Sequence, residues 1–184
     1  FKGTVMVEAW DWSGNHVSQD DGYIVESSKK HEETCRAQIE TITEPGRTVG
    51  SFDYFQTDVR FRLTVEDHYS GLRAVSCTGG STVDVQKDYT EEGIVSRHSE
   101  ELMLEALHNN ENEVPVRVAY EDNAGHKGEL EQRYNIDVTP PVLEVAYDQN
   151  HPSAGGYYRQ ARTAVITVQE RNFDPSDAEF LFTS

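Results

Sequence analysis

Basic residues are scarce in this sequence. Its 184 residues include 16 Lys and Arg against 33 Asp and Glu, which gives a formal net charge of −17 at pH 7. Nucleic acids and anionic membrane surfaces both require a basic face on their partner, so this charge argues against binding to either. The charge suits an acidic, outward-facing protein whose copies repel one another, and it leaves the binding of cations open.

Long hydrophobic runs and clustered cysteines are also missing. No apolar stretch approaches the ~18 residues of a membrane-spanning helix. The opening stretch FKGTVMVEAW has the pattern of a strand rather than of a signal peptide, so we expect an excised fragment or a processed product. Cys35 and Cys77 lack the C-x-x-C spacing of a zinc site. They form either one disulfide or two buried thiols, and the sequence favours the thiols.

Apolar residues alternate with polar ones along most of the chain. Examples are GTVMVEAW, RFRLTVED, TVDVQ, VPVRVAY, PVLEVAY and TAVITVQE. A period of two predicts strands with one buried face, and the Gly, Asn, Asp and Pro clusters between them indicate an antiparallel sandwich or barrel. The run SRHSEELMLEAL (96–107) has helical propensity, but its position between two strands favours a strand.

Two stretches of the chain occur twice. An alternating run leads into Asp-x-x-Gly at 11–14 and again at 122–125, which is 111 residues later. The stretch YFQTDVRFRLTVED (54–67) aligns with YYRQARTAVITVQE (157–170), 103 residues later. These separations fit one sandwich domain per repeat. We therefore predict a complete domain at 36–137, the closing part of a preceding repeat at 1–27 and the opening part of a following repeat at 138–184.

The Asp-x-x-Gly motif itself has a structural interpretation. Gly supplies a positive φ in a tight hairpin, and the Asp side chain accepts hydrogen bonds from backbone N–H groups two or more residues further on. We therefore predict that the repeated motif is a corner of the domain rather than a site used twice.

The sequence resembles a known family in its last third and in its hairpins. YNIDVTPPVLEVAYDQN, followed by GGYYRQARTAVITVQERNFDPSDAEF, is similar to bacterial Ig-like domains of large secreted or surface-anchored proteins. That family opens with Asp-x-Thr-x-Pro-Val and closes with a D-x-x-G-N hairpin. Here His126 stands in place of the usual Asn, and the middle copy has EDHYSGL where the third has ERNFDPS.

The resemblance implies an all-β, Ig-like antiparallel sandwich with no catalytic activity. It further implies tandem repeats that serve as a stalk or spacer in an extracellular bacterial protein, secreted or anchored at the cell surface, with a role in adhesion. The partners would be neighbouring Ig-like repeats. The alternative is a module of the same fold that binds a carbohydrate or a host surface protein.

No catalytic constellation is visible in the sequence. There is no G-x-S-x-G elbow, and the seven His residues are scattered singly in polar surroundings. The acidic residues suggest no acid–base pair by their spacing. We therefore predict no enzymatic activity, no catalytic residues and no organic cofactor.

Calcium is the one metal for which the sequence offers ligands. Asp20, Asp21, Asp122 and Asp137 lie near hairpins or domain edges, where carboxylates of adjacent domains can gather. No D-x-[DN]-x-[DN]-G loop is present, and such acids can equally well serve only to solvate the surface. Asp122 and Asp137 are the candidate calcium ligands.

Aromatic residues and the two incomplete ends suggest further contacts. Trp10, Trp12, Tyr157 and Tyr158 could stack on sugars, or else form core or a partner interface. Residues 1–27 and 138–184 each leave an apolar strand face uncovered. We expect them to pair into a second sandwich, either within one chain or by strand swapping between two chains.

Overall fold

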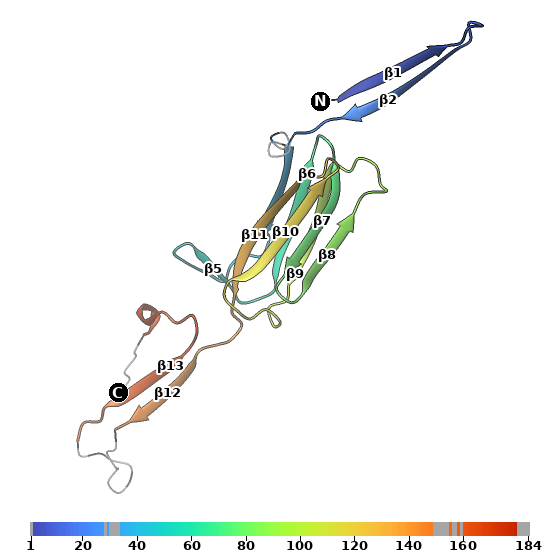
Figure 1. The fold of residues 1–184 in the computed structure, drawn as a ribbon. Helices are drawn as coiled ribbons and strands as arrows, with labels where there is room; N and C mark the ends of the chain where they lie inside the picture. Colours follow the sequence, from blue (N-terminus) through green and yellow to red (C-terminus); the bar gives the residue numbers. More distant parts are fainter. Residues whose placement is uncertain are drawn as a thin grey trace. The chain divides into compact units, whose positions relative to one another are not determined.

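A computed structural model describes residues 2–27, 29, 34–148, 155, 158 and 160–179 (Figure 1). The chain divides into two compact units, Phe1–Val138 and Thr139–Ser184. Among the described residues, no helix is long and apolar enough to cross a membrane.

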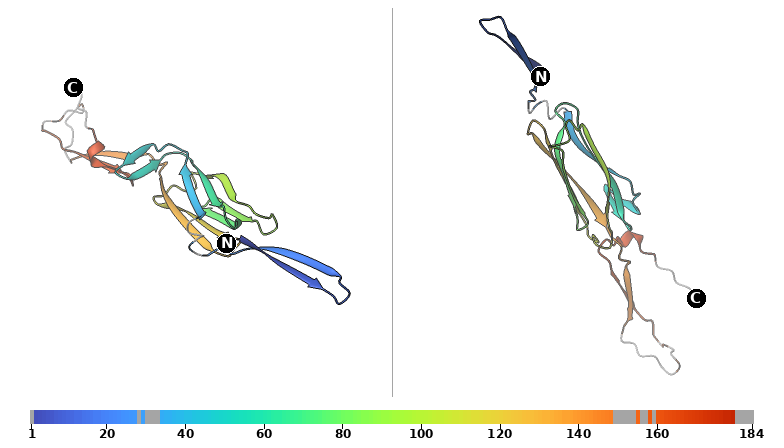
Figure 2. Two further views of the ribbon diagram at one scale, coloured as in Figure 1. Left: turned by 90° about the horizontal axis from the view of Figure 1, so that it is seen from above. Right: turned by 90° about the vertical axis from the view of Figure 1, so that its right-hand side faces the viewer.

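The middle of the first unit is a two-sheet β-sandwich (Figure 2). One sheet has the order β3-β6-β9, formed by Cys35–Thr41, Val59–Asp67 and Arg97–Leu104. The other has the order β4-β5-β11-β10-β7-β8, formed by Arg47–Val49, Phe52–Phe55, Lys127–Ile136, Val114–Asp122, Leu72–Gly79 and Val83–Asp88. All neighbours are antiparallel except β5 and β11, which are parallel. The predicted all-β sandwich is confirmed.

The ambiguous run at 96–107 forms strand β9. It pairs with β6 from Glu66↔Arg97 to Val59↔Leu104. Its buried residues, His98 and Leu104, face the core, so pairing and burial override the helical propensity of Glu, Leu and Met. Between residues 36 and 137, every regular element is a strand, as predicted.

The core lies between the two sheets and follows the period-two pattern. In β6, Val59, Phe61, Leu63 and Val65 are completely buried, and they alternate with more exposed residues. The opposite sheet contributes the buried residues of β7, β10 and β11 to the same cluster. Burying each such side chain stabilises the fold by about 1.5–3 kcal/mol relative to its exposed state.

Both cysteines are free thiols buried in this core. Cys35 begins β3 and Cys77 lies in β7, so each belongs to a different sheet. Burial, with a smaller contribution from the negative charge of Glu100, raises the pKa of Cys77 to about 11. The preference for thiols over a disulfide is confirmed.

The chain enters and leaves the sandwich at opposite ends (Figure 1). Cys35, at the start of β3, pairs with Asp67, the last residue of β6. Ile136, the last residue of β11, pairs with Phe55 at the far end of the sandwich. Successive domains of this kind can therefore follow one another in a line.

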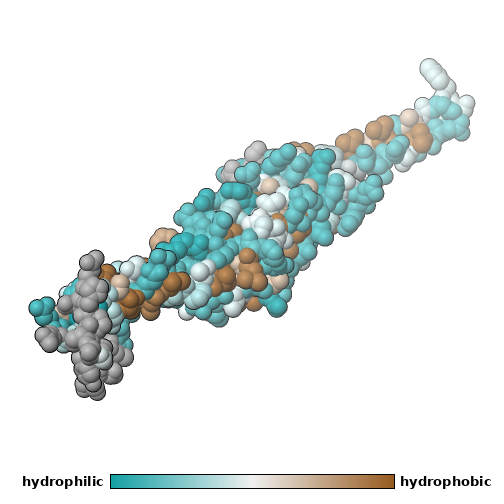
Figure 3. Space-filling model, turned by 90° about the horizontal axis from the view of Figure 1, so that it is seen from below, coloured by the Kyte–Doolittle hydropathy of each residue, from teal (hydrophilic) through white to brown (hydrophobic). Residues whose placement is uncertain are grey.

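Two hairpins flank the sandwich in the sequence. Strands β1 (Lys2–Trp10) and β2 (His16–Ile24) form one two-stranded sheet, and β12 (Val142–Tyr147) and β13 (Ala164–Gln169) form another. A 3₁₀ turn, η2 (Pro175–Asp177), follows β13. Apolar side chains are exposed on both hairpins (Figure 3).

The expected pairing of the two ends within one chain is not seen among the described strands. There, β1 pairs with β2 and β12 pairs with β13, each in its own sheet. A two-stranded hairpin satisfies the hydrogen bonds between its own strands but leaves both faces open, so it is marginal by itself. Pairing between two chains stays a prediction.

Candidate metal centre

The Asp-x-x-Gly motif at Asp122 forms the tight corner between β10 and β11. The N–H of Asp122 donates to the carbonyl of His126 (3.0 Å), and the N–H of Gly125 donates to the carbonyl of Asp122 (3.1 Å). Gly125 has φ +88°, a conformation that favours glycine. The Oδ1 atom of Asp122 accepts the N–H of His126 (2.8 Å). The predicted hairpin chemistry is confirmed.

A second corner follows β6 at the same end of the sandwich. Oδ1 of Asp67 accepts the backbone N–H groups of Tyr69 (2.7 Å), Ser70 (3.1 Å) and Gly71 (3.1 Å). These three bonds fix the carboxylate and leave Oδ2 as its other oxygen. Oδ2 has no hydrogen-bond partner, although Asp67 is 0% exposed.

Hydrogen bonds from Asn123 join the two corners. Its backbone N–H donates to the carbonyl of Gly71 (2.9 Å), and its Nδ2 donates to the carbonyl of Ser70 (3.1 Å). The corners after β6 and β10 are therefore held together by backbone geometry, and this brings Asp67 and Asp122 close to each other.

A third carboxylate comes from the segment that follows β2. Glu26 is 9% exposed; its Oε1 accepts the hydroxyl of Thr34 (3.2 Å), and its Oε2 has no hydrogen-bond partner. The neighbouring carbonyl of Val25 accepts the hydroxyl of Tyr69 (3.4 Å), which links this segment to the second corner. One oxygen each of Glu26, Asp67 and Asp122 lies within 4.8 Å of the other two.

Two side chains border this acidic cluster. Nδ1 of His126 lies 3.0 Å from Oδ2 of Asp122. The Cys35 thiol lies beside Asp67; burial first, and then the negative charges of Asp67 and Asp122, raise its pKa to about 12. Cys35 is therefore an S–H at neutral pH, a weak donor rather than a thiolate ligand. The site offers carboxylate oxygen, which is the chemistry of a hard cation.

The structure places the sequence candidates differently from one another. Asp122 belongs to the cluster, whereas Asp137 lies at the opposite end of the sandwich, where its N–H donates to the carbonyl of Phe55 (2.9 Å). Asp20 and Asp21 are exposed in β2. Sequence reasoning missed Asp67 and Glu26. The signal for Asp67 was available, because an acid, Glu170, occupies the aligned position of the third copy.

The aromatic candidates do not form one surface. Trp10 stacks on His16 with ring centroids 4.6 Å apart, and Trp12 is fully exposed at the hairpin turn. Tyr158 belongs to the second unit, where the Arg162 guanidinium lies 4.0 Å from its ring centroid. Tyr157 lies outside the described residues.

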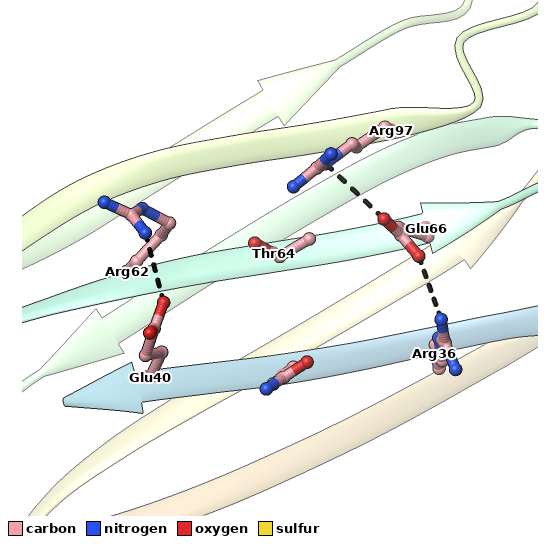
Figure 4. A pocket seen from close by; sticks show the side chains of 7 residues that line it. Arg36, Glu40, Arg62, Thr64, Glu66 and Arg97 are labelled. Atoms are coloured by element: carbon pink, nitrogen blue, oxygen red, sulfur yellow. Dashed lines mark hydrogen bonds and ion pairs between the residues drawn. The ribbon is translucent and has the colours of Figure 1, made fainter.

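A hollow on the outer face of the β3-β6-β9 sheet is lined by ion pairs (Figure 4). Glu66 contacts Arg36 (3.3 Å) and Arg97 (3.5 Å), and Arg62 contacts Glu40 (3.1 Å). The hydrogen bond from Arg36 holds the pKa of Glu66 below its usual value. Because acids and bases are matched across the strands, this face presents no concentrated charge to a ligand.

Comparisons with family models, curated proteins and solved structures found no match to this chain. The candidate metal centre therefore rests on its own geometry.

Proposed function

We propose that the chain is a non-catalytic structural module of tandem Ig-like repeats. It acts as a stalk or spacer in a secreted or surface-anchored bacterial protein and holds an adhesive part away from the cell. Its partners are the neighbouring repeats of the same protein.

The connectivity of the sandwich supports the Ig-like assignment. Successive strands cross between the sheets at β5–β6, β6–β7, β8–β9 and β9–β10, which gives a Greek-key order. A three-stranded sheet faces a sheet whose centre is β11-β10-β7, the arrangement in which Ig-like domains place their first, second and fifth strands opposite the others.

The observation that carries the proposal is the path of the chain. It enters the sandwich at Cys35 and leaves at Ile136, at opposite ends, and matching sequence motifs recur 103 and 111 residues apart. A unit with this path adds length with every repeat, which is what a spacer requires.

Stretching the chain between its two ends in a force microscope tests this role. A load-bearing domain at 36–137 should unfold in one event, with a contour-length gain of about 35 nm, from roughly 3.6 Å per residue less the folded length. Gradual extension without a discrete event would contradict a spacer that bears load.

A binding module is the second candidate, because Trp12 is fully exposed. A large aromatic side chain on a turn can stack on a sugar or enter a partner's pocket. A glycan and host-protein array distinguishes the two functions. A spacer gives no signal above that of the Trp12→Ser variant, whereas a signal lost in that variant favours the binding module.

A further inference from the structure

Three carboxylates lie together at the end of the sandwich where the chain enters it. Asp67 and Asp122 are 0% exposed and Glu26 is 9% exposed, so water screens their mutual repulsion poorly. Among the described residues, the one basic side chain in contact with the cluster is His126, which pairs with Asp122. Buried charges of one sign need a compensating charge or metal ion.

The unpartnered oxygens point to where that charge lies. Oδ2 of Asp67 and Oε2 of Glu26 are buried and have no hydrogen-bond partner. Leaving a buried carboxylate oxygen without a partner is costly, and the second oxygen of each group is already used by N–H or O–H donors. Both oxygens belong to groups whose carboxylates meet within 4.8 Å of Asp122.

We propose that Glu26, Asp67 and Asp122 bind one calcium ion. Two oxygens on opposite sides of Ca²⁺ are about 4.6–5.2 Å apart, since each lies at about 2.3–2.6 Å from the ion, and the cluster fits within this span. Carboxylates binding in monodentate or bidentate fashion, with water, complete its six to eight ligands. The protonated Cys35 removes the thiolate that would favour zinc.

The surrounding groups act on the ligands rather than on the ion. Three backbone N–H groups orient Asp67, and the N–H and ring of His126 orient Asp122. Such outer contacts fix the direction in which each carboxylate presents its free lone pairs. Two ligands are thus held by corners of the sandwich, and binding draws in the third, Glu26, from the segment that follows β2.

The same acidic positions recur along the sequence. Asp137 stands 111 residues after Glu26, the separation of the two Asp-x-x-Gly motifs, and Glu170 stands 103 residues after Asp67. Within its own unit, Glu170 repeats the corner geometry: its Oε1 accepts the N–H of Asn172 (3.1 Å), and its buried Oε2 has no partner. Acids are thus retained in the repeats at two of the three ligand positions.

Calorimetric titration of the metal-stripped chain with CaCl₂ tests the proposal, which does not depend on the spacer role. The wild-type chain should bind one equivalent of Ca²⁺ at this site, and Mg²⁺ should bind at least tenfold more weakly because it requires shorter, stricter coordination. Glu26→Gln and Asp67→Asn should each weaken calcium binding at least tenfold. Both substitutions keep the shape of the side chain, and the amide oxygen introduced by Asp67→Asn remains an acceptor for the three N–H groups.

Asp20→Asn is the matched control, since it removes an exposed acid of β2 and should leave affinity within twofold. Glu26→Gln lies outside the strands, so its result can be interpreted even if Asp67→Asn does not fold. Absence of calcium binding at 10-fold excess over millimolar protein would overturn the proposal. So would binding that survives both ligand variants, binding lost equally in Asp20→Asn, or Mg²⁺ binding as tightly as Ca²⁺.

Discussion

The corners at Asp11 and Asp122 have the same backbone in different surroundings. In both, the Asp N–H donates to the carbonyl four residues on (3.0 Å), Gly donates to the Asp carbonyl (3.1 Å), and φ of Gly is +85° or +88°. Asp11 is exposed, whereas Asp122 is completely buried beside Asp67 and Glu26. The corner is therefore a local structure, and the metal centre arises only where other segments close over it.

The side chain that follows each Gly shows the same division. Nδ2 of Asn15 donates to Oδ2 of Asp11 (2.6 Å), and this hydrogen bond is the main cause of the lowered pKa of Asp11. His126 makes the equivalent contact with Asp122 through Nδ1 (3.0 Å). The departure from the family's usual Asn thus preserves the contact that orients the carboxylate.

Removing the two aspartates should give the largest difference between the corners. In calcium, Asp122→Ala should lower the free energy of unfolding of the sandwich by about 2–4 kcal/mol, because it removes a buried acceptor and a metal ligand. Asp11→Ala should leave the sandwich transition unchanged. Urea unfolding followed by circular dichroism measures both, and equal losses in the two variants would contradict the division between local and buried corners.

Alanine at the two glycines should give a smaller contrast. No atom lies within 4 Å of a Cβ built on Gly14 or Gly125, so the cost of substitution is that of a positive φ alone. Gly125→Ala should destabilise the sandwich by about 1 kcal/mol. In the same urea experiment, Gly14→Ala should leave the sandwich midpoint where it is. A neutral Gly125→Ala would show that the corner does not require its left-handed residue.

Exchanging His126 for the residue of the first copy should have little effect. His126→Asn replaces one donor to Asp122 by another, so we expect stability to change by less than ~0.5 kcal/mol and calcium affinity by less than threefold. His126→Ala, which leaves Oδ2 of Asp122 without this contact, should weaken calcium binding about tenfold. Calorimetry on the two variants checks this, and equal affinities would mean that the contact does not orient the carboxylate.

The smallest expected effect concerns pH and lies away from both corners. Burial lowers the pKa of His98, Glu100 opposes this and Lys87 adds to it; Nδ1 contacts the hydroxyl of Tyr89 (2.7 Å). Because the folded pKa lies below the unfolded value of ~6.5, stability from the neutral ring is complete above that pH and is lost as the pH falls through the folded value. His98→Gln should therefore show a shallower loss of urea midpoint between pH 7.5 and 5. An identical pH profile would contradict this role.

Local patterns in the sequence were enough to predict the strands and the corners. Alternation identifies the inward face of β6, and the Asp-x-x-Gly spacing predicts the hydrogen bonds at Asp11 and Asp122. Even β9 followed from its neighbours, although its residues favour a helix. These features depend on residues a few positions apart.

The metal centre depends on residues that are far apart in the sequence, and only part of it was predicted. Asp122 was a candidate, but Asp67 and Glu26 reach it through the strand order and through the hydrogen bonds of Asn123. Alternation shows which face of a strand is buried and does not show which strand ends meet. For the same reason, Asp137 had the same standing as Asp122 in the sequence, although it lies at the other end of the sandwich.

A crystal structure of the chain grown in calcium chloride tests the central claim most directly. The account predicts one calcium ion at the end of the sandwich, with Oδ2 of Asp67 and carboxylate oxygens of Glu26 and Asp122 at about 2.3–2.6 Å. The corner at Asp11 should hold no ion. A structure in which Oδ2 of Asp67 bonds to a protein donor, or in which calcium binds elsewhere and not to these three residues, would contradict it.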